Sequence, residues 1–159
     1  TVMVGGDRKA FEECGDLWPV LGRKVFYLGS CGSAARMKLA SNLVLGLNRV
    51  ALAEGLAFAE QIGVEPATAL EVLIGSMAYS RAMDVKGRKM VDRDFKVQAR
   101  LSQHLKDVRL MLQAAAAAGL SLPLSETHQR LLEQAEAAGL GELDNSAIVE
   151  VIRKPNPKL

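Results

Sequence analysis

Aromatic side chains are scarce in this sequence: they account for 4% of its 159 residues, although apolar residues of all kinds account for 49%. Alanine and leucine far outnumber the aromatics. Leucine and alanine favour helices, whereas strands are enriched in aromatic and β-branched residues. A chain of this length fits one ordinary domain that buries roughly two thirds of the surface of its unfolded form. The composition therefore indicates a helical domain with an aliphatic core.

Cysteine is also rare, with two residues, Cys14 and Cys31, seventeen positions apart. Neither belongs to a Cys-x-x-Cys or Cys/His pattern, which argues against a zinc motif and against a disulfide framework. His104 and His128 each lack a metal-ligating partner at helical spacing. We expect no metal site, and a reduced, cytoplasmic setting.

The sequence has no large excess of one charge, because its net charge is +2. Domains that bind nucleic acid usually concentrate many unpaired lysines and arginines on one face. We therefore expect small molecules or proteins as partners, and no nucleic acid. Residues 81–100 carry seven basic and three acidic side chains. Such a segment can attract anionic substrates, but it more often forms a solvated helical face.

A signal peptide and a long apolar run are missing as well. Residues 1–6 have neither the basic region nor the long apolar core of a signal peptide. The longest uncharged stretch, residues 110–125, includes Gln113, Gly119 and Pro123. It is shorter than the ~18–20 apolar residues that a membrane-spanning helix requires. We predict no membrane segment.

Strand signals are confined to two short β-prone runs, residues 2–4 and 25–27. Two such strands do not make a stable sheet by themselves. Between them, Asp7 is a good N-cap for a helix over residues 10–17 that is expected to stop near Pro19. The first part of the chain therefore looks like the end of a larger α/β unit whose other strands are missing.

From Ser33 the pattern becomes helical and continues to about Ile62, where Gly63 supplies a C-cap. A helix of that length is a rod of roughly 45 Å, long enough to run between two bodies of a molecule or through an oligomer core. Further helices are expected over residues 66–76, 81–90, 101–118, 123–138 and 145–152. The predicted fold class is all-α, a multi-helix bundle around one long helix, with two short strands at the N-terminus.

Lys38 and Asn42 lie four positions apart and so project from one face of the long helix. Between Arg36 and Arg49, Lys38 is the single charged side chain, set among apolar neighbours. Partial desolvation would lower the pKa of a lysine toward the working pH, as a general acid/base requires. The alternative is that Lys38 extends into solvent, which is the common outcome for an isolated Lys/Asn pair.

Four ordered blocks of this sequence resemble the β-hydroxyacid dehydrogenase family. The string Gly29-x-x-Gly32-x-Ala34-Ala35-x-x-Lys38-x-x-x-Asn42, with Ala53-Glu54-Gly55-Leu56 after it, is similar to the family's interdomain helix. Residues 105–110 resemble its Lys-Asp motif, and residues 122–124 and 141–147 resemble its closing segments. The resemblance covers nearly the whole chain. The family includes 3-hydroxyisobutyrate dehydrogenases, tartronate semialdehyde reductases and glyoxylate/succinic semialdehyde reductases.

The resemblance implies a domain organisation. Residues 1–30 would be the end of a missing Rossmann-type dinucleotide-binding domain, and residues 31–154 a helical substrate and dimerisation domain similar to the C-terminal domain of 6-phosphogluconate dehydrogenase. Residues 155–159 would be a frayed tail. The cofactor would be NAD or NADP, bound mainly by the missing N-terminal domain. The Gly-x-x-Gly spacing at residues 29–32 does not match a dinucleotide fingerprint.

The resemblance also implies roles for single residues. Lys38 would donate the proton when a carbonyl is reduced, and Asn42 would orient substrate and lysine. Lys106 would reach the cofactor near its nicotinamide end. Asp107 would position substrate, or equally would be a surface carboxylate near Arg109. The substrate would be a small anionic hydroxyacid or its semialdehyde.

Two points stay open at the level of the sequence. Ala99 stands where the semialdehyde reductases tend to carry phenylalanine, so the resemblance does not name the substrate. The second function considered is a non-catalytic helical module for oligomerisation or protein interaction. Retention of Lys38 among apolar neighbours favours the enzyme. In either case we expect a homodimer or a homotetramer.

Overall fold

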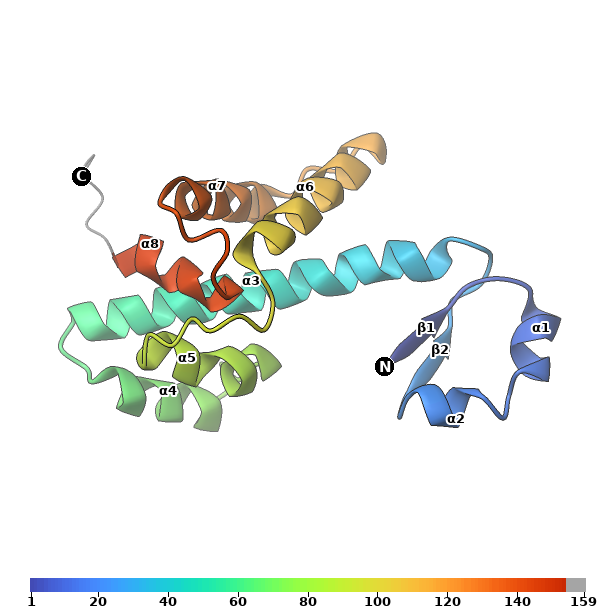
Figure 1. The fold of residues 1–159 in the computed structure, drawn as a ribbon, viewed down its shortest axis with the longest axis horizontal. Coiled ribbons are helices and arrows are strands. Elements are labelled where there is room, and N and C mark those ends of the chain that lie inside the picture. The colour runs from blue at the N-terminus through green and yellow to red at the C-terminus, as the bar shows by residue number, and fades with distance from the viewer. Residues whose placement is uncertain (154–159) are drawn as a thin grey trace. The chain divides into compact units, whose positions relative to one another are not determined.

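The computed structural model describes residues 1–153. It divides into two compact units, residues 1–42 and the described residues from 43 onward, and the division falls within the long helix α3, Ser33–Gln61 (Figure 1). The expected boundary at residues 30 and 31 stays a prediction. The frayed tail predicted for residues 155–159 lies outside the described residues, as does residue 154.

The first unit holds a two-stranded parallel sheet. Strand β1, Val2–Val4, pairs with β2, Val25–Tyr27, with Val2 opposite Val25. A parallel pair needs a crossover connection, and here the crossover carries two short helices. Several apolar side chains of this unit are exposed, namely Leu17, Val20, Leu21 and Phe26. The strands were therefore predicted correctly, and the larger α/β unit to which they were assigned stays a prediction.

The prediction of one helix between the strands was wrong. Helix α1, Arg8–Glu13, ends well before Pro19, and a second helix, α2, covers Trp18–Leu21. Pro19 lies in the first turn of α2, where its missing N–H has no partner to lose, so it starts a helix and does not stop one. The predicted N-cap is confirmed, because the Asp7 carboxylate accepts a hydrogen bond of 2.8 Å from the backbone N–H of Ala10.

Helix α3 contains 29 residues, which agrees with the predicted long helix, and Gly63 follows it with a φ of 88°. By its length and apolar composition alone, α3 could cross a membrane, but core helices of soluble proteins meet the same two criteria. Six of its residues are buried: Gly46, Arg49, Val50, Leu52, Ala53 and Leu56. Because Arg49 is among these buried residues, this part of α3 packs against protein. The absence of a membrane segment stays a prediction.

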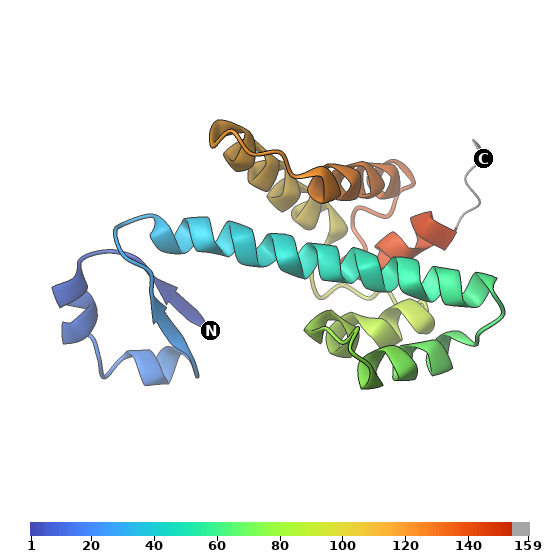
Figure 2. The same ribbon diagram turned by 180° about the vertical axis from the view of Figure 1, so that it is seen from behind.

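The second unit is a bundle of helices around the C-terminal part of α3. Its elements are α4 (Pro66–Gly75), η1 (Met83–Gly87), α5 (Arg88–Val91), α6 (Leu101–Ala117), α7 (Pro123–Ala137), η2 (Asn145–Ile148) and α8 (Val149–Arg153). Both views show α6 and α7 on one side of α3 and α4 and α5 on the other (Figures 1 and 2). The mostly helical fold class is confirmed.

The helix positions after α3 were predicted to within one or two residues, but two local geometries were missed. The helix predicted over residues 81–90 contains a π-helical turn, η1, and the one predicted over residues 145–152 begins as a 3-10 turn, η2. Fully buried aliphatic and methionine side chains from five elements form the core: Leu52, Leu56, Met90, Leu101, Leu105, Leu132 and Ile148. The expectation of an aliphatic core is met.

Candidate active site

Lys38 and Asn42 lie one turn apart near the start of α3, as the spacing predicted. Lys38 is exposed and Asn42 is half-buried. Lys38 takes part in none of the ion pairs among residues 1–153. The Ser41 hydroxyl donates to the backbone carbonyl of Lys38 at 3.0 Å, so it does not engage the ammonium group. The lysine is therefore available to a ligand.

The apolar neighbours of Lys38 do not desolvate it. Met37, Val44 and Leu45 are themselves 45%, 56% and 44% exposed. The partial desolvation that their pattern suggested is thus not provided by the chain itself. A dry environment around the ammonium would need a further body to cover this part of α3.

Helical geometry aligns Lys38 with the buried side of α3. Arg49 lies eleven positions further on, close to three turns, so both residues project from the same side of the helix. Arg49 is only 5% exposed. Lys38 therefore projects from the side of α3 that is buried further along the helix.

The second predicted pair, Lys106 and Asp107, lies on α6. Lys106 is exposed and Asp107 is half-buried. The alternative for Asp107, a surface carboxylate near Arg109, stays open, and Arg109 itself forms its ion pair with Glu133 at 3.1 Å. Lys106 and Asp107 belong to the second unit, whereas Lys38 and Asn42 belong to the first. Each pair is brought together within its own helix, and their assignment to one site stays a prediction.

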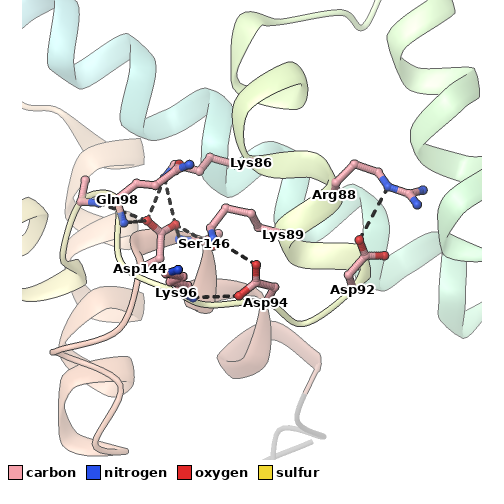
Figure 3. A network of polar contacts seen from close by, with 10 residues as sticks. Lys86, Arg88, Lys89, Asp92, Asp94, Lys96, Gln98, Asp144 and Ser146 are labelled. Atoms are coloured by element: carbon pink, nitrogen blue, oxygen red, sulfur yellow. Dashed lines mark hydrogen bonds and ion pairs between the residues drawn. The ribbon is translucent and has the colours of Figure 1, made fainter.

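Sequence reasoning missed a buried ion pair, shown in Figure 3. The Lys86 ammonium donates to both oxygens of the Asp144 carboxylate, at 2.9 and 2.8 Å, and the two side chains are 7% and 0% exposed. Lys86 had been assigned to a solvated helical face, and this assignment was wrong. Its neighbour Arg88 does pair at the surface, with Asp92, whereas the largely buried Lys89 pairs with the exposed Asp94.

Asp144 is satisfied on every side. Its carboxylate also accepts from the backbone N–H groups of Gln98, Ala99 and Ser146 and from the Ser146 hydroxyl. Burial alone would raise the pKa of Asp144, but the hydrogen bonds from Lys86, Ser146 and Gln98 outweigh it and hold the pKa below the ordinary value. A carboxylate so fully occupied joins the segments around it and has no free oxygen for substrate chemistry.

The two histidines, solitary in the sequence, lie together in the structure. The rings of His104 on α6 and His128 on α7 are 5.1 Å apart between centroids. Burial, the Arg49 charge and the neighbouring ring lower the pKa of His104 to about 3. Burial and Arg49 lower the pKa of His128 to about 4. Both imidazoles are therefore neutral at physiological pH, beside a buried guanidinium.

Arg49 is the cation of this group. Burial lowers its pKa to about 10, against an opposing effect of the Asp144 charge. The side chain stays protonated at neutral pH.

Among residues 1–153 no three His, Cys, Asp or Glu side chains are grouped so that they could hold a metal ion.

The second unit also contains a cavity of about 230 Å³ between α3, α4 and η1. It is lined by Asn48, Ala51, Leu52, Gly55, Leu73, Ala78, Tyr79, Ser80 and Met83. The Tyr79 hydroxyl donates to Asp84 at 2.6 Å, and this hydrogen bond raises the pKa of Tyr79. None of the four predicted site residues lines this cavity.

Comparison with known proteins gives a family match. Residues 32–152 match the family model described as NAD-binding of NADP-dependent 3-hydroxyisobutyrate dehydrogenase. The 2-hydroxy-3-oxopropionate reductase of Escherichia coli (strain K12) is 36% identical over 152 residues, which cover 96% of this chain and 52% of that protein. The cytokine-like nuclear factor N-PAC of Drosophila melanogaster is 30% identical over 147 residues, which cover 92% of this chain and 24% of that protein.

A solved structure supports the fold. The 3-hydroxyisobutyrate dehydrogenase from Salmonella typhimurium superimposes with a TM-score of 0.87 at 24% identity, covering 92% of this chain and 52% of that one. At this identity the likeness concerns the fold alone. This chain spans about half the length of the reductase and of the dehydrogenase that it matches.

Proposed function

The chain belongs to the β-hydroxyacid dehydrogenase family of NAD(P)-dependent oxidoreductases, and we propose that it is the C-terminal, catalytic and oligomerisation part of such an enzyme. The reaction would interconvert a small β-hydroxyacid and its semialdehyde or oxo acid. The match to about half of the reductase and of the dehydrogenase supports a division of labour in which another part of the enzyme holds most of the dinucleotide.

The observation that carries the proposal is the exposed, unpaired ammonium of Lys38, with Asn42 on the next turn, inside the segment that matches the family. During reduction of a carbonyl, negative charge grows on the substrate oxygen. An adjacent ammonium stabilises that charge and then donates its proton. Asn42 would hold the substrate and the lysine in register. In the oxidation direction, neutral Lys38 would act as the base.

The residues present fit the cofactor in part. When bound, NAD(P) supplies the hydride. Lys106 is exposed and forms no ion pair among residues 1–153, so its ammonium is free to reach a polar group of the cofactor near the nicotinamide. Gly29 and Gly32 adopt φ values of 96° and 85° and form a tight junction before α3, but their spacing is not that of a phosphate-binding loop. Asp107, half-buried beside Lys106, would position substrate.

The proposal extends to architecture and environment. The second unit with α3 would be the helical substrate and dimerisation domain, of the 6-phosphogluconate dehydrogenase C-terminal type, and the assembly a homodimer or homotetramer in the cytoplasm. A covering body would also dry the surroundings of Lys38, which the chain alone leaves exposed. Sedimentation of the intact protein at several concentrations tests the assembly.

Substitution of Lys38 tests the catalytic assignment. In the intact enzyme, Lys38→Ala should lower kcat for reduction of 2-hydroxy-3-oxopropionate by about 10²–10⁴-fold, with little change in the affinity for NADH or NADPH. Lys24→Ala, which removes another exposed lysine of the same unit, is the matched control. Turnover of Lys38→Ala equal to that of the control would remove Lys38 from the mechanism.

A non-catalytic interaction module is the second candidate. It is favoured by the likeness to N-PAC, which is named as a cytokine-like nuclear factor and not as a reductase or dehydrogenase. The same assay separates the two functions. A wild-type protein that binds NADPH but turns over no small semialdehyde or hydroxyacid would favour the module.

A further inference from the structure

Arg49, His104 and His128 form a buried cluster at the junction of three helices. They come from α3, α6 and α7 and are 5%, 7% and 3% exposed. Gly46 of α3 lets the rings approach the helix, because a Cβ at this position would lie 2.6 Å from His104 Nε2 and 2.9 Å from His128 Cε1. The proposed reaction uses none of these residues.

Four polar atoms of this cluster have no hydrogen-bond partner among residues 1–153. Arg49 Nε and Nη1, His104 Nε2 and His128 Nε2 are buried and form no hydrogen bond to any residue in 1–153. Most buried polar groups in folded proteins are hydrogen-bonded, and an unsatisfied one costs about 1–3 kcal/mol. The guanidinium nitrogens are donors, and each imidazole Nε2 is a donor in one of the two neutral tautomers. These adjacent side chains therefore point to a shared acceptor outside residues 1–153.

The charge of the cluster identifies the acceptor. Arginine nitrogens only donate, and a neutral imidazole offers one donor. No carboxylate among residues 1–153 forms an ion pair with Arg49, and Asp144, whose charge acts on it, is bonded to Lys86 at 2.8 Å. Water would accept a hydrogen bond but would leave the buried charge uncompensated, whereas an anion does both.

We propose that Arg49, His104 and His128 form a binding site for a small monovalent anion such as chloride. The anion would accept hydrogen bonds from the guanidinium and from imidazole N–H groups, and it would join α3, α6 and α7 inside the second unit. This inference is independent of the proposed enzymatic function, since it needs neither Lys38 nor the cofactor.

Thermal unfolding in different sodium salts tests the site. At equal ionic strength and neutral pH, 100 mM chloride or bromide should raise the Tm of the wild-type protein by roughly 3 °C over gluconate, which is too large to enter, and the rise should saturate. In Arg49→Met the difference between salts should vanish. Arg109→Met, which removes an exposed arginine of α6, should keep it.

A second measurement covers the case in which Arg49→Met does not fold. Crystals of the wild-type protein grown in bromide should show an anomalous peak within hydrogen-bond distance of Arg49 and at least one of the two imidazoles. No salt specificity in the wild-type Tm, no bromide peak at the cluster, or salt specificity that persists in Arg49→Met would each overturn the proposal. The first two outcomes would indicate water or a protein group as the acceptor.

Discussion

Two buried polar clusters of the second unit differ in how they are satisfied. The Lys86–Asp144 pair has opposite charges, and backbone and hydroxyl donors complete the carboxylate (Figure 3). The Arg49–His104–His128 cluster has one charge and four buried nitrogens that no group in the described part of the chain, residues 1–153, pairs with. Satisfied polar groups fix one arrangement of a core, whereas unsatisfied ones mark a place where something binds or titrates. We therefore interpret the first cluster as structural. The second, which we propose binds an anion, is called the responsive cluster below.

The largest loss of unfolding free energy is expected when the buried Lys86–Asp144 pair is broken. Asp144→Ala removes the partner of a lysine that is 7% exposed and leaves three backbone N–H groups and the Ser146 hydroxyl without their acceptor. Loss of one partner of a buried ion pair costs about 3–5 kcal/mol of unfolding free energy. Urea unfolding followed by circular dichroism measures it.

A surface pair in the same region is the matched control. Arg88 and Asp92 lie 3.7 Å apart, and their side chains are 65% and 52% exposed. Asp92→Ala should cost less than about 1 kcal/mol, because exposed pairs are weak. If Asp144→Ala and Asp92→Ala were equally mild, the Lys86–Asp144 pair would not be the structural centre of the second unit.

The contributions of the two clusters to the unfolding free energy should also be lost in different pH ranges. Histidines whose pKa is lowered from 6.5 to about 3 and about 4 stay neutral in the folded protein, while the unfolded chain takes up protons below pH 6.5. The unfolded state then binds more protons, so the unfolding free energy falls as the pH drops from about 6.5 toward 4, by a few kcal/mol. Asp144 affects the unfolding free energy at lower pH. Because its pKa is lowered in the folded protein, its stabilising contribution is complete above the ordinary pKa of 3.8 and is lost as the pH falls further.

Unfolding free energies measured between pH 7.5 and 3 separate these contributions. In a His104→Leu/His128→Leu double variant, the slope between pH 6.5 and 4 should flatten, and the loss below pH 3.8 should remain. Lys86→Met should do the reverse, since it removes the main donor to Asp144. A wild-type slope between pH 6.5 and 4 that persists in the double variant would assign the acid sensitivity to other groups.

The sequence predicted the regular elements because their signals are local. The long helix, the Asp7 cap and the two strands follow from periodicity and single-residue chemistry over a few turns. The break between α1 and α2 was missed because proline both ends and begins helices, and its place in the first turn depends on residues before it. The Lys38/Asn42 pair was predicted for the same local reason.

The buried clusters could not be predicted because their members lie far apart in the sequence. Lys86 and Asp144 are 58 positions apart, and nothing in the pattern around Lys86 separates it from the six other basic residues of segment 81–100. His104 and His128 come from different helices and meet only when α6 and α7 pack together. Packing, and not residue type, decides which charged side chains are buried.

The smallest change in unfolding free energy is expected from substitutions of two glycines in α3, one beside the imidazole rings and one away from them. Gly46→Ala places a Cβ 2.6 Å from His104 Nε2, so the rings of the responsive cluster must shift. Alanine gains up to about 1 kcal/mol over glycine inside a helix, but overpacking costs about 1–3 kcal/mol. We expect a net loss of about 1 kcal/mol in unfolding free energy, and a change in the salt response of the cluster.

Gly55→Ala on the same helix is the control. A Cβ there would meet Leu73 Cδ1 at 4.0 Å, an ordinary contact, so the helical preference of alanine is not opposed and the variant should be more stable than wild type by up to about 1 kcal/mol. Opposite signs for two identical changes on α3, measured by urea unfolding, would locate the close contact at Gly46. Equal stabilisation by both would show that the imidazoles move aside freely, and the cluster would then be too loose to hold an anion.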